Sequence, residues 1–330
     1  MSTEPVYIYP SLGNSFSMKR YLTGVIGGLK ANKIPYKVIQ PKVSGLIGKY
    51  LIYPFLAFKN RHKLGWHLVI SERYGYLIPF MSKRSIIVCH DLHTLYKQAN
   101  TPKIHQFLYK SFIKAMKKAG KVVCVSNHTK KDLISYFSIF SESNVQVIHN
   151  GIEEFWIEDK VKGSIDEDLI SFCKSHKVIL SVGTDVWYKD MSTTLSILGK
   201  LGDEYALLRI GELNEHSLAM IQDLSLTGRV RQEANVSDEV LKYCYQNANC
   251  LLFPSLSEGF GWPALEALLC NCPVVTTGKG AIAEVVKDQA NFFESIEEGA
   301  MMVRELKIKP EKDRLKFLSW EAQVLILLSN

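Results

Sequence analysis

The 330-residue sequence is 47% hydrophobic and 22% charged, which is typical of a soluble globular protein and excludes a disordered or fibrous chain. Its seven cysteines form no CxxC pair and no Cys-His cluster, so a zinc module is not expected and a reducing, cytoplasmic location is favoured. No apolar run reaches the ~18 to 20 residues of a membrane span, and the N-terminus lacks a signal-peptide pattern, so we expect neither an embedded nor an exported protein.

The net charge of +7 conceals two halves of opposite sign. Residues 1–150 hold 22 Lys and Arg against 5 Asp and Glu, a net charge of +17, whereas residues 151–330 hold 18 against 28, a net charge of −10. This asymmetry predicts two domains that bind different partners.

The chain begins with the strand, loop and helix order of an α/β domain. Val6–Tyr9 is a short apolar run, and the polar loop after it contains Gly13, Asn14 and Ser15. A helix is predicted after this loop, and residues 36–39 can form a second strand.

Residues 45–63 combine leucines and aromatics with a basic end. One interpretation is an amphipathic segment at a membrane surface, with Lys59, Arg61 and Lys63 among the lipid headgroups. The other is a core helix broken by Pro54. Both remain open.

Two further strands are predicted at residues 67–70 and 85–89. The second delivers His90 and Asp91 to a strand end, which is where α/β proteins place ligand-binding and catalytic side chains. The alternative is a histidine capped by its neighbour in an ordinary turn.

A basic amphipathic helix is predicted between residues 103 and 121. Its expected buried face consists of Ile104, Phe107, Leu108, Phe112, Ala115, Met116 and Ala119. Its expected exposed face carries Lys110, Lys114, Lys117, Lys118 and Lys121.

The acidic half opens with a helix that we expect Ser164 to cap. Asp166 and Asp168 form an Asp-x-Asp pair, which can hold a divalent metal at a strand end, but here the pair begins a helix. We therefore interpret these acids as helix-capping groups and expect no metal site. Strands follow at residues 178–182 and 206–210.

The strongest pattern in the chain lies between Asn249 and Val286. A buried strand at residues 250–253 ends at a proline, and a glycine-rich loop carries Glu258. A helix from about Pro263 carries Glu266, so both glutamates can face one crevice at the carboxyl end of the strand. The positive end of this helix favours an anion.

This pattern, PSLSEGFGWPALEA followed by CPVVTT and AEVV, closely resembles the retaining glycosyltransferases of family 4, which have the GT-B architecture. The resemblance implies that Glu258 holds donor-sugar hydroxyls and that Glu266 holds the nucleotide ribose. It also implies that His90 approaches the donor sugar. The family often has an arginine where this chain has Thr184, so this part of the family's diphosphate site is not matched here.

The same resemblance implies roles for three loops. Gly183 and Lys189 match the phosphate-binding turn, where a lysine can neutralise a diphosphate. The donor-binding loop is completed by Gly259, Phe260 and Gly261. The loop between acceptor and donor contains Gly13, Asn14 and Ser15.

The implied fold is two Rossmann-like domains facing each other across a cleft. We expect an acceptor domain at 1–160, a nucleotide-sugar domain at 161–315 and a helix at 316–330 that crosses back. The implied reaction moves one sugar, with retention, from a nucleotide sugar to a glycan or lipid-linked acceptor in polysaccharide or glycoconjugate synthesis. We expect no metal or other cofactor.

The excess positive charge predicts peripheral docking of the first domain on an anionic membrane through Lys110, Lys114, Lys117 and Lys118. Alternatives are a nucleic-acid-binding protein, a glycosyltransferase that modifies DNA, or a phosphorylase or epimerase with the same architecture. Nucleic acid is disfavoured because no recognition motif is present. A glycoside hydrolase is disfavoured because its two carboxylates must flank the scissile bond.

Overall fold

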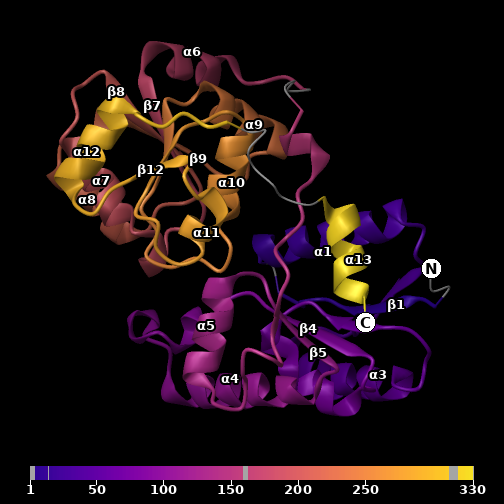
Figure 1. Cartoon of the computed structure of the whole chain (residues 1–330). Coiled ribbons are helices and arrows are strands. Elements are labelled where there is room, and N and C mark those ends of the chain that lie inside the picture. The colour runs from indigo at the N-terminus through magenta and orange to yellow at the C-terminus, as the bar shows by residue number, and fades with distance from the viewer. Residues whose placement is uncertain (1–3, 14, 159–162, 312–318, 330) are drawn as a thin grey trace. The chain divides into compact units, whose positions relative to one another are not determined.

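The structure is a computed structural model that describes residues 4–13, 15–158, 163–311 and 319–329. It divides into two compact units (Figure 1). Unit 1 holds the described residues up to Glu153 together with 319–329, and unit 2 holds those from Glu154 to 311. Each unit has its own parallel sheet, so the predicted α/β class with two Rossmann-like domains is confirmed. The predicted boundaries at 160/161 and 315/316 fall at or beside residues outside the described set.

The sheet of unit 1 has the strand order β2-β1-β3-β4-β5-β6, with parallel pairing throughout. Its strands are β1 Val6–Tyr9, β2 Tyr36–Val38, β3 His67–Val69, β4 Ser85–Cys89, β5 Lys121–Cys124 and β6 Gln146–Val147. The order reverses between β1 and β3, so the loops after these two strands border the switch point where α/β sheets bind ligands.

The helices of unit 1 cover both faces of this sheet (Figure 1). They are α1 Phe16–Ala31, α2 Gly45–Ile47, the π-helical turn η1 Gly48–Ile52, α3 Tyr53–Asn60, α4 Lys103–Ala115, α5 Asn127–Tyr136 and α13 Trp320–Leu328. Short 3-10 segments are η2 Glu72–Phe80, η3 His93–Leu95, η4 Lys97–Ala99 and η5 Met116–Lys118.

The last helix, α13, packs against α1 in unit 1. The ring of Trp320 lies over Gly24, where an added Cβ would meet the indole at 2.1 Å. Tyr21 contacts the same ring edge-on at 5.2 Å. The C-terminal helix therefore returns to the first domain, as the resemblance implied.

The predicted helix at 103–121 is too long. The α-helix ends at Ala115, and Lys121 is instead the first residue of β5. There the Lys121 ammonium is buried and donates to the carbonyl of Leu327 at 3.1 Å. A partner so distant in sequence leaves no local pattern, which is why periodicity alone misplaced this lysine.

The predicted buried face of this helix is wrong in its N-terminal half, although Met116, predicted to be buried, is buried. Tyr109 and Ile113 face the core, whereas Ile104 and Phe107 are 61% and 66% exposed.

The segment at 45–60 also has one buried and one exposed face. Tyr53 and its neighbours pack inward, and Pro54 lies in the first turn of α3, where it does not break the helix.

The sheet of unit 2 has the order β12-β11-β10-β7-β8-β9 and is parallel throughout. Its strands are β7 Lys177–Val182, β8 Tyr205–Ile210, β9 Val230–Glu233, β10 Cys250–Phe253, β11 Val274–Thr276 and β12 Ala290–Phe292. The first strand, β7, lies beside β10, so the switch point of this unit lies between the loops that follow these two strands.

The helices of unit 2 are α6 Glu167–Ser175, α7 Met191–Gly199, α8 Glu215–Asp223, α9 Asp238–Asn247, α10 Trp262–Leu269, α11 Ile282–Val286 and α12 Ile296–Glu305. Short 3-10 segments are η6 Glu154–Trp156, η7 Trp187–Lys189 and η8 Thr227–Arg229. The cap of α6 is Asp166, whose carboxylate accepts from the Leu169 amide at 3.2 Å, and not Ser164 as predicted. The capping interpretation of the Asp-x-Asp pair is thus confirmed, with Asp168 in the first turn.

Candidate functional site

The loops after β7 and β10 meet at the switch point of unit 2. The amide of Leu256, in the second loop, donates to the carbonyl of Tyr188, in the first, at 2.7 Å. This backbone bond fixes the relative position of the two predicted donor-binding loops.

The side chains of Lys189 and Glu258 form an ion pair across these loops. Their Nζ and Oε1 atoms lie 2.6 Å apart, and the side chains are only 13% and 10% exposed. The ammonium also lies 4.7 Å from the ring centroid of Phe253. Gly183, with a φ of +123°, lies alongside, and an added Cβ would lie 3.4 Å from Cε of the lysine. Gly183, Lys189 and Glu258 are therefore brought together.

The backbone of the Glu258 loop is supported by Gly280 and Ala281, to which the sequence analysis assigned no role. Gly280 has a φ of +67°, and an added Cβ would lie 2.5 Å from the Glu258 amide nitrogen. The next amide, of Ala281, donates to the Glu258 carbonyl at 3.1 Å. The signal in the sequence was the glycine pair in TTGKGA, directly after the strand β11. A glycine is required here because of both the positive φ and the close approach.

The helix α10 begins at Trp262 after Gly261, whose φ is +97°. Glu266 lies on its buried face, and Tyr245 donates to the Glu266 carboxylate at 3.0 Å. Within the loop before this helix, Gly259 is half-buried and Phe260 is buried. The loop amides and the helix N-terminus supply positive partial charge in the same region as Lys189.

Arg209 lies beneath the Gly183 turn and was missed at the sequence level. It is fully buried on β8, where it donates to the Ser181 hydroxyl at 2.9 Å and to the Gly183 carbonyl. Burial lowers the pKa of Arg209 to about 10, so the guanidinium stays charged at neutral pH. An arginine within the apolar run YALLRI was the available signal. It places a cation near the turn where the family's arginine is replaced by Thr184.

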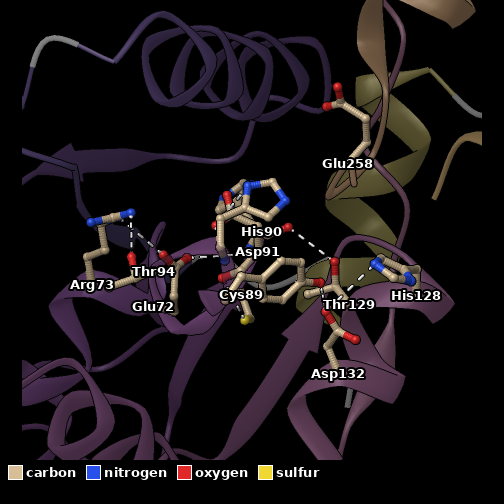
Figure 2. Close-up of polar contacts among 12 residues, drawn as sticks. Glu72, Arg73, Cys89, His90, Asp91, Thr94, His128, Thr129, Asp132 and Glu258 are labelled. Carbon is tan, nitrogen blue, oxygen red and sulfur yellow. Dashed lines mark hydrogen bonds and ion pairs between the residues drawn. The ribbon is translucent and has the colours of Figure 1, made fainter. Parts of the chain in front are cut away.

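In unit 1, His90 follows β4 and is held on several sides (Figure 2). Its Nε2 lies 2.8 Å from the Ile70 carbonyl, and because a carbonyl can only accept, Nε2 carries the proton. Tyr21 packs edge-on against the ring at 4.7 Å, and the Thr129 hydroxyl donates to the His90 carbonyl at 3.1 Å. Burial lowers the pKa of His90 to about 4. At neutral pH its Nδ1 is therefore a hydrogen-bond acceptor.

Glu72, the first residue of η2, is a second residue that sequence reasoning missed. Its buried carboxylate accepts from the His90 amide at 3.2 Å and from the Tyr109 hydroxyl at 3.4 Å (Figure 2). Burial, reinforced by the nearby charge of Asp91, raises the pKa of Glu72 to about 7. The only signal was an acidic residue directly after a predicted strand in the basic half.

The loop after β1 borders the switch point of unit 1. The amide of Leu12 donates to the Tyr74 hydroxyl at 2.7 Å, which ties this loop to the segment after β3. Gly13 and Ser15 are exposed, and the Ser15 side chain makes no capping bond to α1. Asn14 lies outside the described residues.

The four predicted membrane-docking lysines, Lys110, Lys114, Lys117 and Lys118, are all exposed. The first two lie on α4, and the other two lie in the 3-10 turn η5. In the part of the chain that the structure describes, no helix is both long enough and apolar enough to cross a bilayer.

Two family models match this chain. "Glycosyl transferases group 1" matches residues 169–313, and "Glycosyltransferase Family 4" matches residues 26–154. The first match contains Lys189, Glu258 and Glu266, and the second contains Glu72 and His90. The two matched segments lie in different units.

Curated relatives of this chain are named glycosyltransferases, and a solved structure shares its fold. The O-antigen chain mannosyltransferase RfbU of Salmonella typhimurium is 25% identical over 74% of this chain and 65% of that enzyme. A Campylobacter jejuni enzyme named N-acetylgalactosamine-N,N'-diacetylbacillosaminyl-diphospho-undecaprenol 4-alpha-N-acetylgalactosaminyltransferase is 26% identical over 87% of this chain and 82% of its own length. The crystal structure of Anabaena HepE with UDP and glucose superposes with a TM-score of 0.72 at 14% identity, covering 99% of this chain and 96% of that one.

Proposed function

Because this chain belongs to the GT-B glycosyltransferases of the family 4 type, we propose that it transfers one sugar from a nucleotide-sugar donor, with retention of configuration, to a glycan or lipid-linked acceptor. The names of its relatives support this proposal, since RfbU is a mannosyltransferase for an O-antigen chain and the C. jejuni enzyme is named for a diphospho-undecaprenol acceptor. The corresponding role is polysaccharide or glycoconjugate synthesis.

The observation that carries the proposal is the Lys189–Glu258 ion pair at the switch point of unit 2. In the proposed reaction the bond between the anomeric carbon and the diphosphate oxygen breaks, and negative charge develops on the diphosphate. Lys189 and the amides before α10 stabilise this charge. The acceptor hydroxyl forms the new bond on the same face, and its proton leaves with the diphosphate. Arg209 adds a fixed positive charge beneath the same turn.

The remaining site residues bind and orient the donor. Glu258 accepts hydrogen bonds from sugar hydroxyls, and the Lys189 pair holds it in position before the donor arrives. Glu266 accepts from the ribose hydroxyls. In unit 1, His90 Nδ1 offers an acceptor to a hydroxyl of the sugar, and Gly13 and Ser15 belong to the acceptor loop.

The proposed reaction needs no divalent metal, because Lys189 and the helix amides supply the positive charge that the diphosphate requires. Asp166 caps α6, and Asp168 lies in the first turn of the same helix. EDTA is expected to leave transfer unchanged. Loss of transfer in EDTA that manganese or magnesium restores would reverse this assignment.

Unit 1 is proposed to dock peripherally on the cytoplasmic face of an anionic membrane. Four exposed lysines lie on α4 and η5, beside the exposed side chains of Ile104 and Phe107. Exposed apolar side chains flanked by lysines are the surface composition that interfacial helices use.

Donor binding can be tested by thermal-shift screening against UDP-, GDP-, ADP- and dTDP-sugars. A ligand at 100 times its dissociation constant adds about 2.7 kcal/mol to the free energy of unfolding. One nucleotide series is expected to stabilise the parent and to lose most of this effect in Glu266→Ala. Stabilisation by none of the four series would contradict the proposal.

A further inference from the structure

Unit 1 contains a cavity of ≈ 520 Å³ that the proposed donor chemistry does not use. Residues from η1, η2, η3, η4, α4 and the loop before α4 line it, and none of these lining residues is acidic. Two are cationic, Lys49 and Arg73, and two are histidines, His93 and His105. Its polar lining also includes the hydroxyls of Thr94 and Thr101. Ammonium, guanidinium, imidazolium and hydroxyl groups are the donors that bind phosphate oxygens.

The cations in this cavity are positioned but only partly neutralised. The Lys49 ammonium lies 5.2 Å and 5.5 Å from the ring centroids of Tyr50 and Tyr74, and no described carboxylate lies within ion-pair distance of it. Arg73 donates to the Thr94 hydroxyl at 3.1 Å, and its side chain is 54% exposed (Figure 2). The Lys49 charge therefore has no described carboxylate beside it, and the Arg73 guanidinium, which lies near Glu72, is half exposed.

Two carboxylates lie close to residues of the cavity lining. Glu72 Oε1 is 3.6 Å from Nε of Arg73, and Asp91 Oδ1 is 3.6 Å from Nδ1 of His93. Glu72 is buried, and its carboxylate also accepts from Tyr109 and the His90 amide, so it is turned toward the interior. Neither carboxylate contacts Lys49 or His105. Positive charge thus dominates the cavity.

Exposed apolar side chains lie in the same two stretches of chain that contribute residues to the cavity. On the segment from α2 to α3, Leu46, Ile47, Leu51 and Phe55 are each at least 60% exposed, and on α4 so are Ile104 and Phe107. We call these six residues the apolar surface. Tyr50 and Leu108, which lie within the same two stretches, line the cavity itself. The rings of Tyr50 and Phe112 lie 6.4 Å apart, so η1 and α4 are neighbours and border one cavity.

We infer that this cavity binds the phosphate or diphosphate group of an amphiphilic acceptor, whose hydrocarbon chain lies on the apolar surface. This inference rests on the proposed function, because it names the class of acceptor. A neutral free oligosaccharide needs neither the Lys49 and Arg73 cations nor the apolar side chains. A lipid phosphate needs both, since its headgroup binds cations while its chain removes exposed leucine and phenylalanine from water.

The test uses isothermal titration of the full chain with farnesyl diphosphate, inorganic diphosphate and farnesol. Farnesyl diphosphate is expected to bind the parent most tightly, and Lys49→Gln/Arg73→Gln is expected to raise its Kd at least tenfold. The matched control is Lys30→Gln/Lys83→Gln, which removes the same charge from exposed positions outside the cavity. Lys83 precedes β4 whereas the cavity residues His93 and Thr94 follow it, so this control is expected to stay within about twofold of the parent.

Each result has a defined meaning. No binding by the parent, or an equal loss in the control, would overturn the inference. If inorganic diphosphate binds as tightly as farnesyl diphosphate, the cavity is a site for free anions. If farnesol binds as tightly as farnesyl diphosphate, the cations do not contribute to binding. Lys189→Met must keep farnesyl diphosphate binding, because that lysine belongs to unit 2. If no nucleotide sugar stabilises the protein while farnesyl diphosphate still binds, the proposed function fails and the cavity assignment stands.

Discussion

Lys189 and Glu258 form a 2.6 Å ion pair between the loops that follow two adjacent strands, β7 and β10. Both side chains are almost buried, so each charge depends on the other for solvation. The pair therefore connects the stability of unit 2 to the two groups that the proposed reaction uses.

Breaking this pair has a predictable effect on stability. Lys189→Met and Glu258→Gln are each expected to lower the free energy of unfolding by about 3 kcal/mol, because each leaves a buried polar group without its partner. The double variant is expected to regain most of this loss and to remain inactive. Denaturant unfolding and a transfer assay measure the two effects. A double variant no more stable than the weaker single one would show that the two side chains do not stabilise each other.

Glu258 and Glu266 are expected to fail in different ways. Glu258→Ala should lose the sugar orientation and lower kcat by about 10²- to 10³-fold, with nucleotide binding retained. Glu266→Ala should weaken nucleotide binding at least tenfold. Tyr245→Phe, which removes the hydroxyl that donates to Glu266, is the milder control. Steady-state kinetics and nucleotide titration separate these effects, and parental activity in both Ala variants would refute the assigned roles.

Glu72 and His90 have opposite effects on the pH dependence of stability. The pKa of Glu72 is raised from 4.5 to about 7. Its contribution to the free energy of unfolding is therefore fully present below pH 4.5 and is lost as the pH rises toward 7. The pKa of His90 is lowered from 6.5 to about 4, so its contribution is present above pH 6.5 and is lost as pH falls toward 4. Between pH 4.5 and 6.5 the two slopes cancel.

The variant Glu72→Gln should reveal the histidine slope. Relative to the parent, its free energy of unfolding is expected to fall by about 1.4 kcal/mol for each pH unit below 6.5. In the double variant Glu72→Gln/His90→Gln, the free energy of unfolding should again change with pH in parallel with that of the parent. Urea unfolding at several pH values provides the measurement, and a Glu72→Gln profile parallel to the parent would contradict the assigned protonation states.

Membrane docking is testable by co-sedimentation with liposomes. Anionic vesicles at low salt are expected to bind the parent, with about 1 kcal/mol contributed by each lysine near the surface. Changing Lys110, Lys114, Lys117 and Lys118 to Gln should abolish sedimentation. The matched control changes four other exposed lysines of unit 1 to Gln: Lys30, Lys37, Lys83 and Lys131. If the parent binds neutral and anionic vesicles equally, or if the control loses as much binding, these four lysines do not mediate membrane docking.

Much of the fold was predictable, because parallel strands are buried on both faces and read as short apolar runs. The strands Val6–Tyr9, Ser85–Cys89 and Cys250–Phe253 were predicted to the residue. The helix after the Glu258 loop was predicted to within one residue of its start, because a glycine and a proline mark that point. Glu258 and Lys189 were both singled out before their contact was known.

The rest depended on contacts between distant residues. Glu72 bonds to the amide of His90, Arg209 to the carbonyl of Gly183, and Lys121 to a carbonyl at the other end of the chain. Each is a charged side chain within a buried region, where local periodicity carries no signal. The face of α4 was misassigned for a related reason, since a helix that exposes Ile104 and Phe107 breaks the rule that apolar side chains face the core.

The most direct test of the central claim is the anomeric configuration of the transferred sugar, read by NMR from a reaction in EDTA with the nucleotide sugar that stabilises the protein. The expected product has the same configuration as the donor, forms with the parent, and is absent with Lys189→Met. An inverted product, or phosphorolysis or epimerisation without transfer, would contradict retaining glycosyl transfer by this chain.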